Sequence, residues 1–532
     1  MIRVMSNSSE MAATVASDDR EYPGAHTQTA IARVVIGELE RVLPATARRP
    51  LTAQTSLSAC GIDDVLLGDA VARIEGRYGM RFRAEWLALV RNCGDLVDCV
   101  AERMFDAADR TAGQAAEALP SRSRLVEQRT APAPATGGVF PECAALEQRL
   151  ADLQAAGLEN PFRLATESVR GRTAQIGGRE VVCFTSFDYL GLGSHPDVIQ
   201  GAKDAIDRFG CGASASRMVG GNNILLDELD TELAAFMGAE RATVFPCGYG
   251  TNASVFAHLF GREDLILYDE LAHNSIVQGA NASQAATRSF RHNDHDQLDA
   301  LLRDIRGRYR RVVVAIEGVY SMDGDYPDLP RFIEVKQRHD ALLYVDEAHS
   351  IGTMGQNGRG ICEFFDVDPA AGDLWMGTIS KAFGSGGGYL AGNRELIDYL
   401  GLTTPAFVFS TACSPPNAAA ALAAVRVLRR EPERVERLRE RSELFLKLAN
   451  DVGLDTGSSR DTPVIPVILG SSQRALAVSQ QLLELGINAR PILYPAVRES
   501  AARVRFFVTS EHSEEQIVAT VEAVAEVAAA TS

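Results

Sequence analysis

Apolar, β-branched runs alternate with helical patterns from about residue 141 to residue 401, and no other feature constrains the fold as strongly. The strand candidates are ATVFP (242–246), LILYD (265–269), RVVVAIEG (311–318), ALLYVDEA (341–348) and LWMGTIS (374–380). Strands separated by helices form a mostly parallel sheet, because each parallel connection needs a crossover segment. The sequence therefore predicts an α/β domain whose ligands bind beyond the carboxyl ends of its strands.

The chain has 532 residues, too many for one average domain, and its composition divides it into regions. Residues 1–22 are polar and aperiodic, which predicts a disordered tail. Residues 23–106 carry apolar positions at helical spacing and predict a small all-helical unit. Residues 107–140 are rich in Ala, Pro, Arg, Ser and Thr and predict a linker. We expect a large domain over 141–401 and a smaller α+β domain over 402–532.

Charge and cysteine usage argue against several function classes. The net charge of -17 disfavours broad binding to nucleic acid or to an anionic membrane. No apolar run reaches the roughly 18 residues of a membrane span, and the first residues do not form a secretory signal. The nine cysteines are dispersed and include no CxxC pair, so we expect reduced thiols, no metal site and a cytoplasmic location.

The segment GTISKAFGSGGGYL (377–390) places one lysine among hydroxyl groups and glycines. Thr378 and Ser380 precede Lys381, and glycines follow it. Hydroxyls and closely approaching backbone suit a phosphate ester, and an amine that forms a Schiff base is best held near such an anchor. A lone lysine after a strand is usually a solvated surface residue, so this interpretation depends on the motifs elsewhere in the chain.

Four further motifs follow strand candidates: YVDEAHSIGTMGQNGRG (344–360), EGVYSMDGD (317–325), DELAHNSIV (269–277) and FPCGYGTN (245–252). Asp346 stands at a strand end, where a carboxylate can keep a pyridinium nitrogen protonated. His349, Ser321 and His273 lie just beyond strand ends. The last motif leads into a helix start, where backbone N–H groups bind anions. Each motif alone is weak, since Asp346 could simply cap a helix beside a surface His349.

In this order and with these separations, the five motifs resemble the α-oxoamine synthase family of fold-type I pyridoxal-phosphate enzymes. The resemblance covers about residues 145–525 and includes FDYLGLGSHPDVI (187–199), FRHND (290–294), FSTACSPP (409–416) and RVRFFVTSEHS (503–513). It implies a large domain with a mostly parallel sheet, a smaller C-terminal α+β domain, and pyridoxal 5'-phosphate as cofactor.

The resemblance also implies roles for the residues at matching positions. Lys381 would bind the cofactor covalently and later move the α-proton of the substrate. His273 would stack on the cofactor ring, and Asp346 would pair with the pyridine nitrogen. His349 and Ser321 would lie near the phenolic oxygen.

Other matching positions concern the phosphate and the substrate. Arg505 would take the carboxylate of the amino acid by a bidentate contact. Arg503 is a weaker candidate for the same role. The groups implied to hold the phosphate are Thr378, Ser380, the amides of Gly248 and Tyr249, and Thr411 from the neighbouring subunit of a homodimer.

The activity implied by the resemblance is a decarboxylative condensation. Glycine, alanine or serine would react with an acyl thioester of coenzyme A or of a carrier protein, giving an α-amino ketone for secondary metabolism or lipid synthesis. Phe187 and Leu226 depart from common family patterns, which have Asn or Tyr and His there. Because both changes are apolar, we hypothesise a medium or long acyl chain.

Within residues 23–106, the stretch LSACGIDDVLLGDAVARIEGRYGMRF resembles an acyl carrier protein. Asp64 stands where carrier proteins have the serine that accepts phosphopantetheine, and a carboxylate cannot replace that hydroxyl. We therefore expect a carrier-like domain that carries nothing, and that docks a separate carrier protein or stabilises the dimer. An unrelated helical bundle or an inert remnant of gene fusion are the alternatives.

Two other function classes remain open. One is a different fold-type I enzyme, an aminotransferase or a retro-aldol lyase, which would share Asp346 and Lys381. The other is a scaffold without activity, although Lys381, Asp346 and His273 are all retained.

Overall fold

The computed structural model describes residues 28–43, 140–155, 157–158, 160–494 and 496–531, and positions 51, 55, 57, 62, 67, 70, 71, 73, 74, 93, 96 and 100. The chain divides into two compact units, Met1–Ala135 and Thr136–Ser532. The tail predicted over 1–22 and all of the linker predicted over 107–140 except residue 140 lie outside the described residues.

The first unit contains helix α1 (Gln28–Val42), which buries Val35 and Leu39 completely. Both belong to an apolar cluster that also contains Leu43, Leu51, Leu57, Ile62, Leu67, Ala70, Val71, Ile74, Cys93, Leu96 and Val100. Residues 67, 70, 71 and 74 are helical and buried, with the spacing of one helix face. Asp64 lies outside the described residues.

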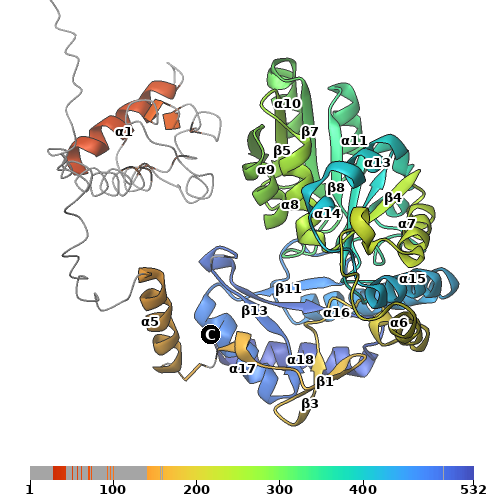
Figure 1. The fold of residues 1–532 in the computed structure, drawn as a ribbon. Coiled ribbons are helices and arrows are strands. Elements are labelled where there is room, and N and C mark those ends of the chain that lie inside the picture. Colours follow the sequence, from red (N-terminus) through yellow and green to blue (C-terminus); the bar gives the residue numbers. More distant parts are fainter. Residues whose placement is uncertain are drawn as a thin grey trace, which may run out of the picture. The chain divides into compact units, whose positions relative to one another are not determined.

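Seven strands form the central sheet of the second unit, in the order β4-β10-β9-β8-β7-β5-β6 (Figure 1). They are β4 (Arg241–Phe245), β5 (Asp264–Asp269), β6 (Ala286–Phe290), β7 (Arg311–Glu317), β8 (Leu342–Asp346), β9 (Leu374–Thr378) and β10 (Gly388–Gly392). β10 is antiparallel to both neighbours, and all other neighbouring pairs are parallel. Every residue of β5 and β9 is buried, as expected for strands covered on both faces.

Helices lie on both faces of this sheet (Figure 1). They are α7 (Ile224–Met237), α8 (Gly248–Leu259), α9 (Asn274–Ala282), α10 (His295–Ile305), α11 (Leu329–Arg338) and α13 (Arg394–Thr403), with the short α12 (Ile361–Phe364) and α14 (Pro405–Val408). Along β7, Val312 and Val314 join one apolar cluster while Val313 and Ala315 join another. This two-residue period places the strand between two helical layers.

The C-terminal part forms a smaller α+β layer. Its elements are α16 (Glu433–Asp451), β11 (Val464–Ile468), α17 (Ser472–Glu484), β12 (Ile487–Asn488), β13 (Arg490–Ile492), β14 (Arg503–Phe507) and α18 (Glu514–Ala530). β14 lies between β11 and β13 in a three-stranded sheet. The predicted α/β fold with a smaller C-terminal α+β part is confirmed.

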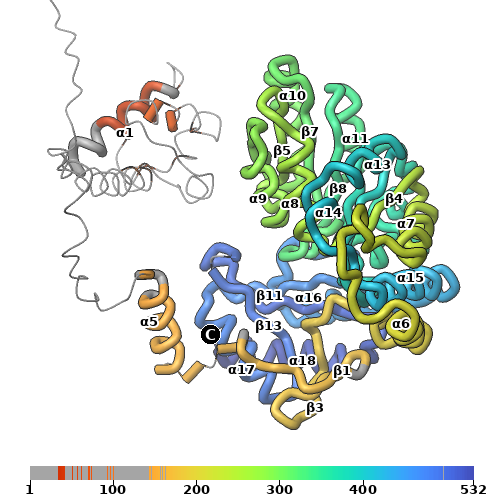
Figure 2. The backbone as a smooth tube through the Cα atoms, viewed as in Figure 1, coloured from red at the N-terminus to blue at the C-terminus, as the bar shows by residue number. Residues whose placement is uncertain are grey.

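The start of the second unit also packs against this C-terminal part, as Figure 2 shows. After α5 (Pro141–Ala155), the strands β1 (Ser168–Arg170), β2 (Thr173–Ile176) and β3 (Arg179–Cys183) form a sheet with β12. β3 and β12 pair in parallel, so residues about 300 positions apart are neighbours.

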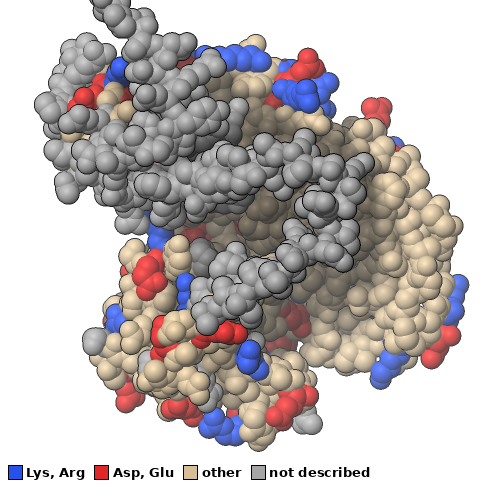
Figure 3. Space-filling view, turned by 60° about the vertical axis from the view of Figure 1, so that its left-hand side comes forward, with Lys and Arg blue, Asp and Glu red and all other residues tan. Residues whose placement is uncertain are grey.

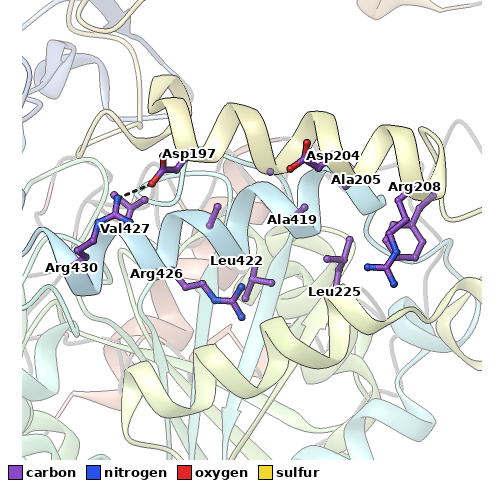
Figure 4. Close-up of a pocket in the computed structure, with 13 residues that line it drawn as sticks. Asp197, Asp204, Ala205, Arg208, Leu225, Ala419, Leu422, Arg426, Val427 and Arg430 are labelled. Atoms are coloured by element: carbon purple, nitrogen blue, oxygen red, sulfur yellow. Dashed lines mark hydrogen bonds and ion pairs between the residues drawn. The ribbon is translucent and has the colours of Figure 1, made fainter.

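A pocket of about 350 Å³ lies between α6 (Pro196–Phe209), α7 and α15 (Pro415–Arg430) (Figure 4). Leu225 and Leu422 contribute to its apolar lining, and Arg426 at its edge is paired with Glu228 and Glu232. This pocket shares no residue with the group around Lys381 described below.

The distribution of charged side chains and the apolar length of the helices both concern the partners that the protein could bind. Acidic and basic side chains occur in small groups on the face drawn in Figure 3. Among the described residues, no helix combines the length and the apolar character needed to cross a bilayer.

Candidate active site

Parallel strands bring distant polar residues to one edge of the central sheet. β5, β7, β8 and β9 run in the same direction, and Glu317 of β7 is directly opposite Asp346 of β8. Asp346 in turn is opposite Met376, two residues before the end of β9. The carboxyl ends of these strands therefore meet where ligands bind in open α/β sheets.

Lys381 lies in the connection between β9 and β10, which are antiparallel and pair Thr378 with Gly388. Its side chain is half-buried, and its Nζ lies 5.8 Å from the centre of the Phe187 ring. Burial lowers the pKa of Lys381 to about 8, although the carboxylates of Asp346 and Glu317 oppose this shift. An amine with this pKa is partly neutral near physiological pH, which a Schiff-base lysine requires.

We predict that covalent attachment of pyridoxal phosphate to the apo protein accelerates as pH rises through about 8. The folded protein lowers the pKa of Lys381, so protonated, unreactive amine dominates below that pH. The measurement is borohydride trapping from pH 6 to pH 10, followed by quantification of the modified Lys381 peptide. A midpoint near the ordinary lysine value of about 10.4 would show that the amine is not perturbed.

Hydroxyls and a helix start, groups of the kind that bind anions, form a corner beside Lys381. The Thr378 and Ser380 hydroxyl oxygens lie 2.7 Å apart. α8 begins at Gly248, and a Cβ at that position would stand 3.1 Å from Thr378 Oγ1 and 3.2 Å from Met376 Cε. Glycine thus lets the first turn of the helix approach the two hydroxyls. Tyr249 follows in the first turn and is half exposed, and its hydroxyl donates to Asn274 Oδ1 at 2.8 Å.

Asp346 and His273 approach this corner from two other strand ends. Asp346 is 4% exposed and accepts from Asn252 Nδ2 at 2.7 Å and from the Ala348 N–H at 2.9 Å. His273 is the N-cap of α9, and its backbone N–H donates to Glu317 Oε1 at 2.5 Å. Loss of surrounding water lowers the pKa of His273, and Lys381 lowers it further against the pull of Asp346.

His349 follows Asp346 in the turn after β8 and is buried. Its Nδ1 lies 2.7 Å from the Tyr189 hydroxyl. Burial lowers the pKa of His349 well below its usual range, with Lys381 and Arg505 contributing. Since burial also raises the pKa of Tyr189, this pair is a phenol and a neutral imidazole.

Arg505 reaches the site from β14 of the C-terminal layer. Its Nη1 donates to the Ser321 carbonyl at 2.6 Å, and its guanidinium carbon lies 4.4 Å from the centre of the Phe507 ring. Its Nε is buried without a partner among the described residues. Arg503 instead donates to the Met322 carbonyl at 2.8 Å and to Asp323 at 2.7 Å, so its guanidinium already forms an ion pair within the protein.

The predicted residues are not all in one group. Lys381, His273, Asp346, His349 and Arg505 are linked through the pKa shifts that they impose on one another. Thr411 precedes α15 and is exposed in this single chain. Of the two departures from the family pattern, Phe187 is 36% exposed beside Lys381, whereas Leu226 is fully buried in the core. In this chain Phe187 lies beside Lys381 and Leu226 packs in the core, and the hypothesis of a medium or long acyl chain stays a prediction.

Four residues that contact these groups were not predicted from the sequence, namely Asn252, Ser275, Glu317 and Tyr189. Each lies within a motif that was recognised. Asn252 stands four residues after Gly248 on α8, and this one-turn spacing was a signal that it shares a helix face with the corner beside Lys381.

Pyridoxal phosphate fits the arrangement of these residues. Four groups meet at the strand ends of a mostly parallel sheet. They are a lysine with a lowered pKa, a buried carboxylate, an imidazole and a helix start of the kind that binds anions. Fold and site together define a fold-type I pyridoxal-phosphate enzyme.

Comparisons with known proteins agree with this class. The family model for aminotransferase class I and II matches residues 179–524. The 8-amino-7-oxononanoate synthase of Symbiobacterium thermophilum is 39% identical over 372 residues, covering 70% of this chain and 94% of that protein. The serine palmitoyltransferase structure from Sphingomonas wittichii has a TM-score of 0.69 and 32% identity, covering 73% and 97%.

A second serine palmitoyltransferase structure, solved with pyridoxal phosphate, has a TM-score of 0.70 and 29% identity and covers 74% of this chain and 99% of that one. The chain belongs to the aminotransferase class I and II family. Within it, the relatives identify a pyridoxal-phosphate-dependent acyltransferase of the α-oxoamine synthase type.

Proposed function

We propose that this enzyme condenses an amino acid with an acyl thioester, releases carbon dioxide and forms an α-amino ketone. The observation that carries the proposal is the convergence of Lys381, Asp346 and Arg505 at one sheet edge. The names of the relatives, 8-amino-7-oxononanoate synthase and serine palmitoyltransferase, support the same reaction class.

Bound pyridoxal phosphate supplies an electron sink for the bond that breaks at the α-carbon. The Asp346 carboxylate would keep a proton on the ring nitrogen, and the His273 ring would cover one face. Neutral Lys381 Nζ would take the α-proton and return a proton to the product carbon. Ser321 and His349 would lie near the phenolic oxygen, while Thr378, Ser380 and the start of α8 would hold the phosphate.

Arg505 would bind the carboxylate of the amino acid. The Ser321 carbonyl fixes one of its terminal nitrogens, and the Phe507 ring supports the guanidinium plane. The guanidinium N–H groups that these contacts leave over would then donate to a substrate carboxylate. Holding that group fixes which bond of the α-carbon is aligned for cleavage.

A homodimer would complete the site. Met218, Val219 and Phe409 are 51%, 83% and 85% exposed, an apolar surface that a monomer rarely presents. Their segments are neighbours, because the Ala412 N–H donates to the Ala215 carbonyl at 3.0 Å. Thr411 lies in this region, so a second copy seated here would bring it to the phosphate of its partner's site.

Substrate choice is tested by one matrix of assays. Free thiol release is measured with glycine, alanine and serine against acetyl and long-chain thioesters. Since Phe187 presents an apolar ring beside Lys381, we expect a long-chain donor to be preferred by about tenfold or more, the value of two buried methylene groups. A preference for the acetyl donor would remove the chain-length proposal, and thiol release without any amino acid would remove the condensation.

The first unit would act as a carrier-like domain that does not itself carry the acyl group. Deletion of residues 1–140, which keeps α5 and everything after it, is expected to slow turnover of a carrier-bound donor by about tenfold or to weaken dimerisation. The coenzyme A thioester is the matched control donor. Unchanged rate and unchanged sedimentation would show that this unit is an inert remnant.

An aminotransferase or retro-aldol lyase is the alternative enzyme class, and it shares Lys381 and Asp346. Either activity would proceed without a thioester. A non-catalytic scaffold is the remaining alternative, and detectable turnover excludes it.

A further inference from the structure

Asn252 is a buried amide on α8 that joins two residues of the candidate site. Its Nδ2 donates to Asp346 Oδ2 at 2.7 Å and to Ser275 Oγ at 2.9 Å, while the Tyr344 hydroxyl donates to its Oδ1 at 2.6 Å. The residue is 1% exposed, so water does not compete for these contacts. One side chain thus connects α8, β8 and α9.

The carboxylate of Asp346 fixes the direction of every hydrogen bond in this network. An ionised carboxylate only accepts, so the amide must face it with its NH₂ group. The amide oxygen then faces Tyr344, whose hydroxyl has to donate. Burial raises the pKa of Tyr344 well above its usual range, which keeps that proton in place.

The donor and acceptor roles set by Asp346 also determine the hydrogen bonds of His273. Ser275 Oγ already accepts a hydrogen bond from Asn252 Nδ2, and it lies 2.6 Å from His273 Nδ1. The Ser275 N–H also points to Nδ1, at 3.2 Å. With two donors directed at it, Nδ1 is an acceptor, and the imidazole proton is on Nε2.

We propose that Asn252 is a positioning residue that fixes the orientation of the Asp346 carboxylate and the Nε2-protonated tautomer of His273. The inference rests on the proposed function, in which Asp346 pairs with the ring nitrogen of pyridoxal phosphate. The Asn252 NH₂ group donates to Asp346 Oδ2 and so holds that carboxylate in one orientation. Without it, the described contacts leave Asp346 only the Ala348 N–H.

Two variants separate this role from packing. In Asn252→Leu the donor is absent at every pH. In Asn252→Asp the shape is kept, and a protonated carboxyl can still donate to Asp346 while an ionised one repels it. The other titratable groups whose charge acts on or responds to Asp346 are Tyr344, His273, Glu317, Lys381, Glu347 and Tyr389, and all of them stay the same in both variants.

The readout is the dissociation constant of pyridoxal phosphate, divided by the wild-type value at the same pH. For Asn252→Leu we expect a ratio of about ten from pH 6 to pH 9, the loss of one charge-assisted hydrogen bond. For Asn252→Asp we expect a ratio near one to three at pH 6 that climbs to about ten or more at pH 9. Tyr344→Phe, the matched control, removes one partner of the amide but leaves Asp346 to orient it, so its ratio stays within about threefold.

A ratio for Asn252→Asp that does not change with pH would overturn the proposal, whether the ratio is high or low. If Asn252→Leu does not fold, by circular dichroism of the apo protein, the aspartate variant alone decides. The assay contains no thioester, so failure of the proposed condensation would leave this result interpretable.

Discussion

Replacement of Lys381 by alanine is expected to lower turnover by on the order of 10⁴-fold and to abolish covalent attachment of pyridoxal phosphate. The half-buried Nζ is the amine beside Asp346 and Glu317, and its pKa of about 8 suits both Schiff-base formation and proton transfer. Thiol release and the visible Schiff-base absorbance are measured on the same preparation. Both signals should disappear together.

Lys203→Ala is the matched control for that variant. Lys203 lies on α6, is exposed and takes part in none of the contacts described around Lys381. Turnover and absorbance should stay within about twofold of wild type, since surface substitutions of this kind rarely change stability. An unchanged absorbance spectrum in Lys381→Ala would place the Schiff base on another lysine.

Replacement of His292 by leucine is expected to destabilise the second unit by about 3 kcal/mol. The imidazole bridges two buried carboxylates, with Nδ1 2.9 Å from Asp269 and Nε2 2.9 Å from Asp325. Removing it leaves both carboxylates without a cation. Asp325 also closes the loop that presents Ser321, because its carbonyl accepts from the Tyr320 N–H at 2.9 Å.

The pH dependence of that loss follows from the pKa of His292. Hydrogen bonds to Asp269 and Asp325 raise it to about 10 against the opposing effect of burial, which is the largest single cause. A raised pKa in the folded state gives stability that is full below the unfolded value of about 6.5 and is lost as pH rises through about 10. The difference between wild type and His292→Leu should therefore shrink across that window.

Urea unfolding of the apo protein at several pH values measures the effect. His295→Leu is the control, because the ion pair of His295 is with Asp296, whose side chain is 93% exposed, and the expected loss is below about 1 kcal/mol. Equal losses for the two histidines would mean that the buried bridge contributes no more than a surface pair.

The sequence was sufficient to predict most strands of the central sheet, because continuous apolar runs leave a strong local pattern. β5, β7, β8 and β9 are continuous apolar runs, and their polar ends carry the recognised motifs. β6 and β10 were missed, since ATRSF alternates with polar residues and GYLAG is flanked by glycine. Their place in the sheet comes from pairing, which local patterns do not encode.

The supporting residues could not be predicted for a different reason. Asn252 contacts Asp346 across 94 positions of sequence, and Tyr189 contacts His349 across 160. Such contacts depend on how helices pack over the sheet. Leu226 was noted from the sequence as a departure from the family pattern, and its burial in the core likewise depends on packing.

The central claim is that this enzyme joins an amino acid to an acyl thioester with loss of the amino-acid carboxyl group. The most direct test combines carboxyl-labelled amino acid, a long-chain thioester and the loaded enzyme, and measures labelled carbon dioxide and free thiol together. We predict that one molecule of labelled carbon dioxide is released for each molecule of free thiol, and that Lys381→Ala releases neither. An oxo acid or an aldehyde formed without thiol release would contradict it and would identify an aminotransferase or a retro-aldol lyase.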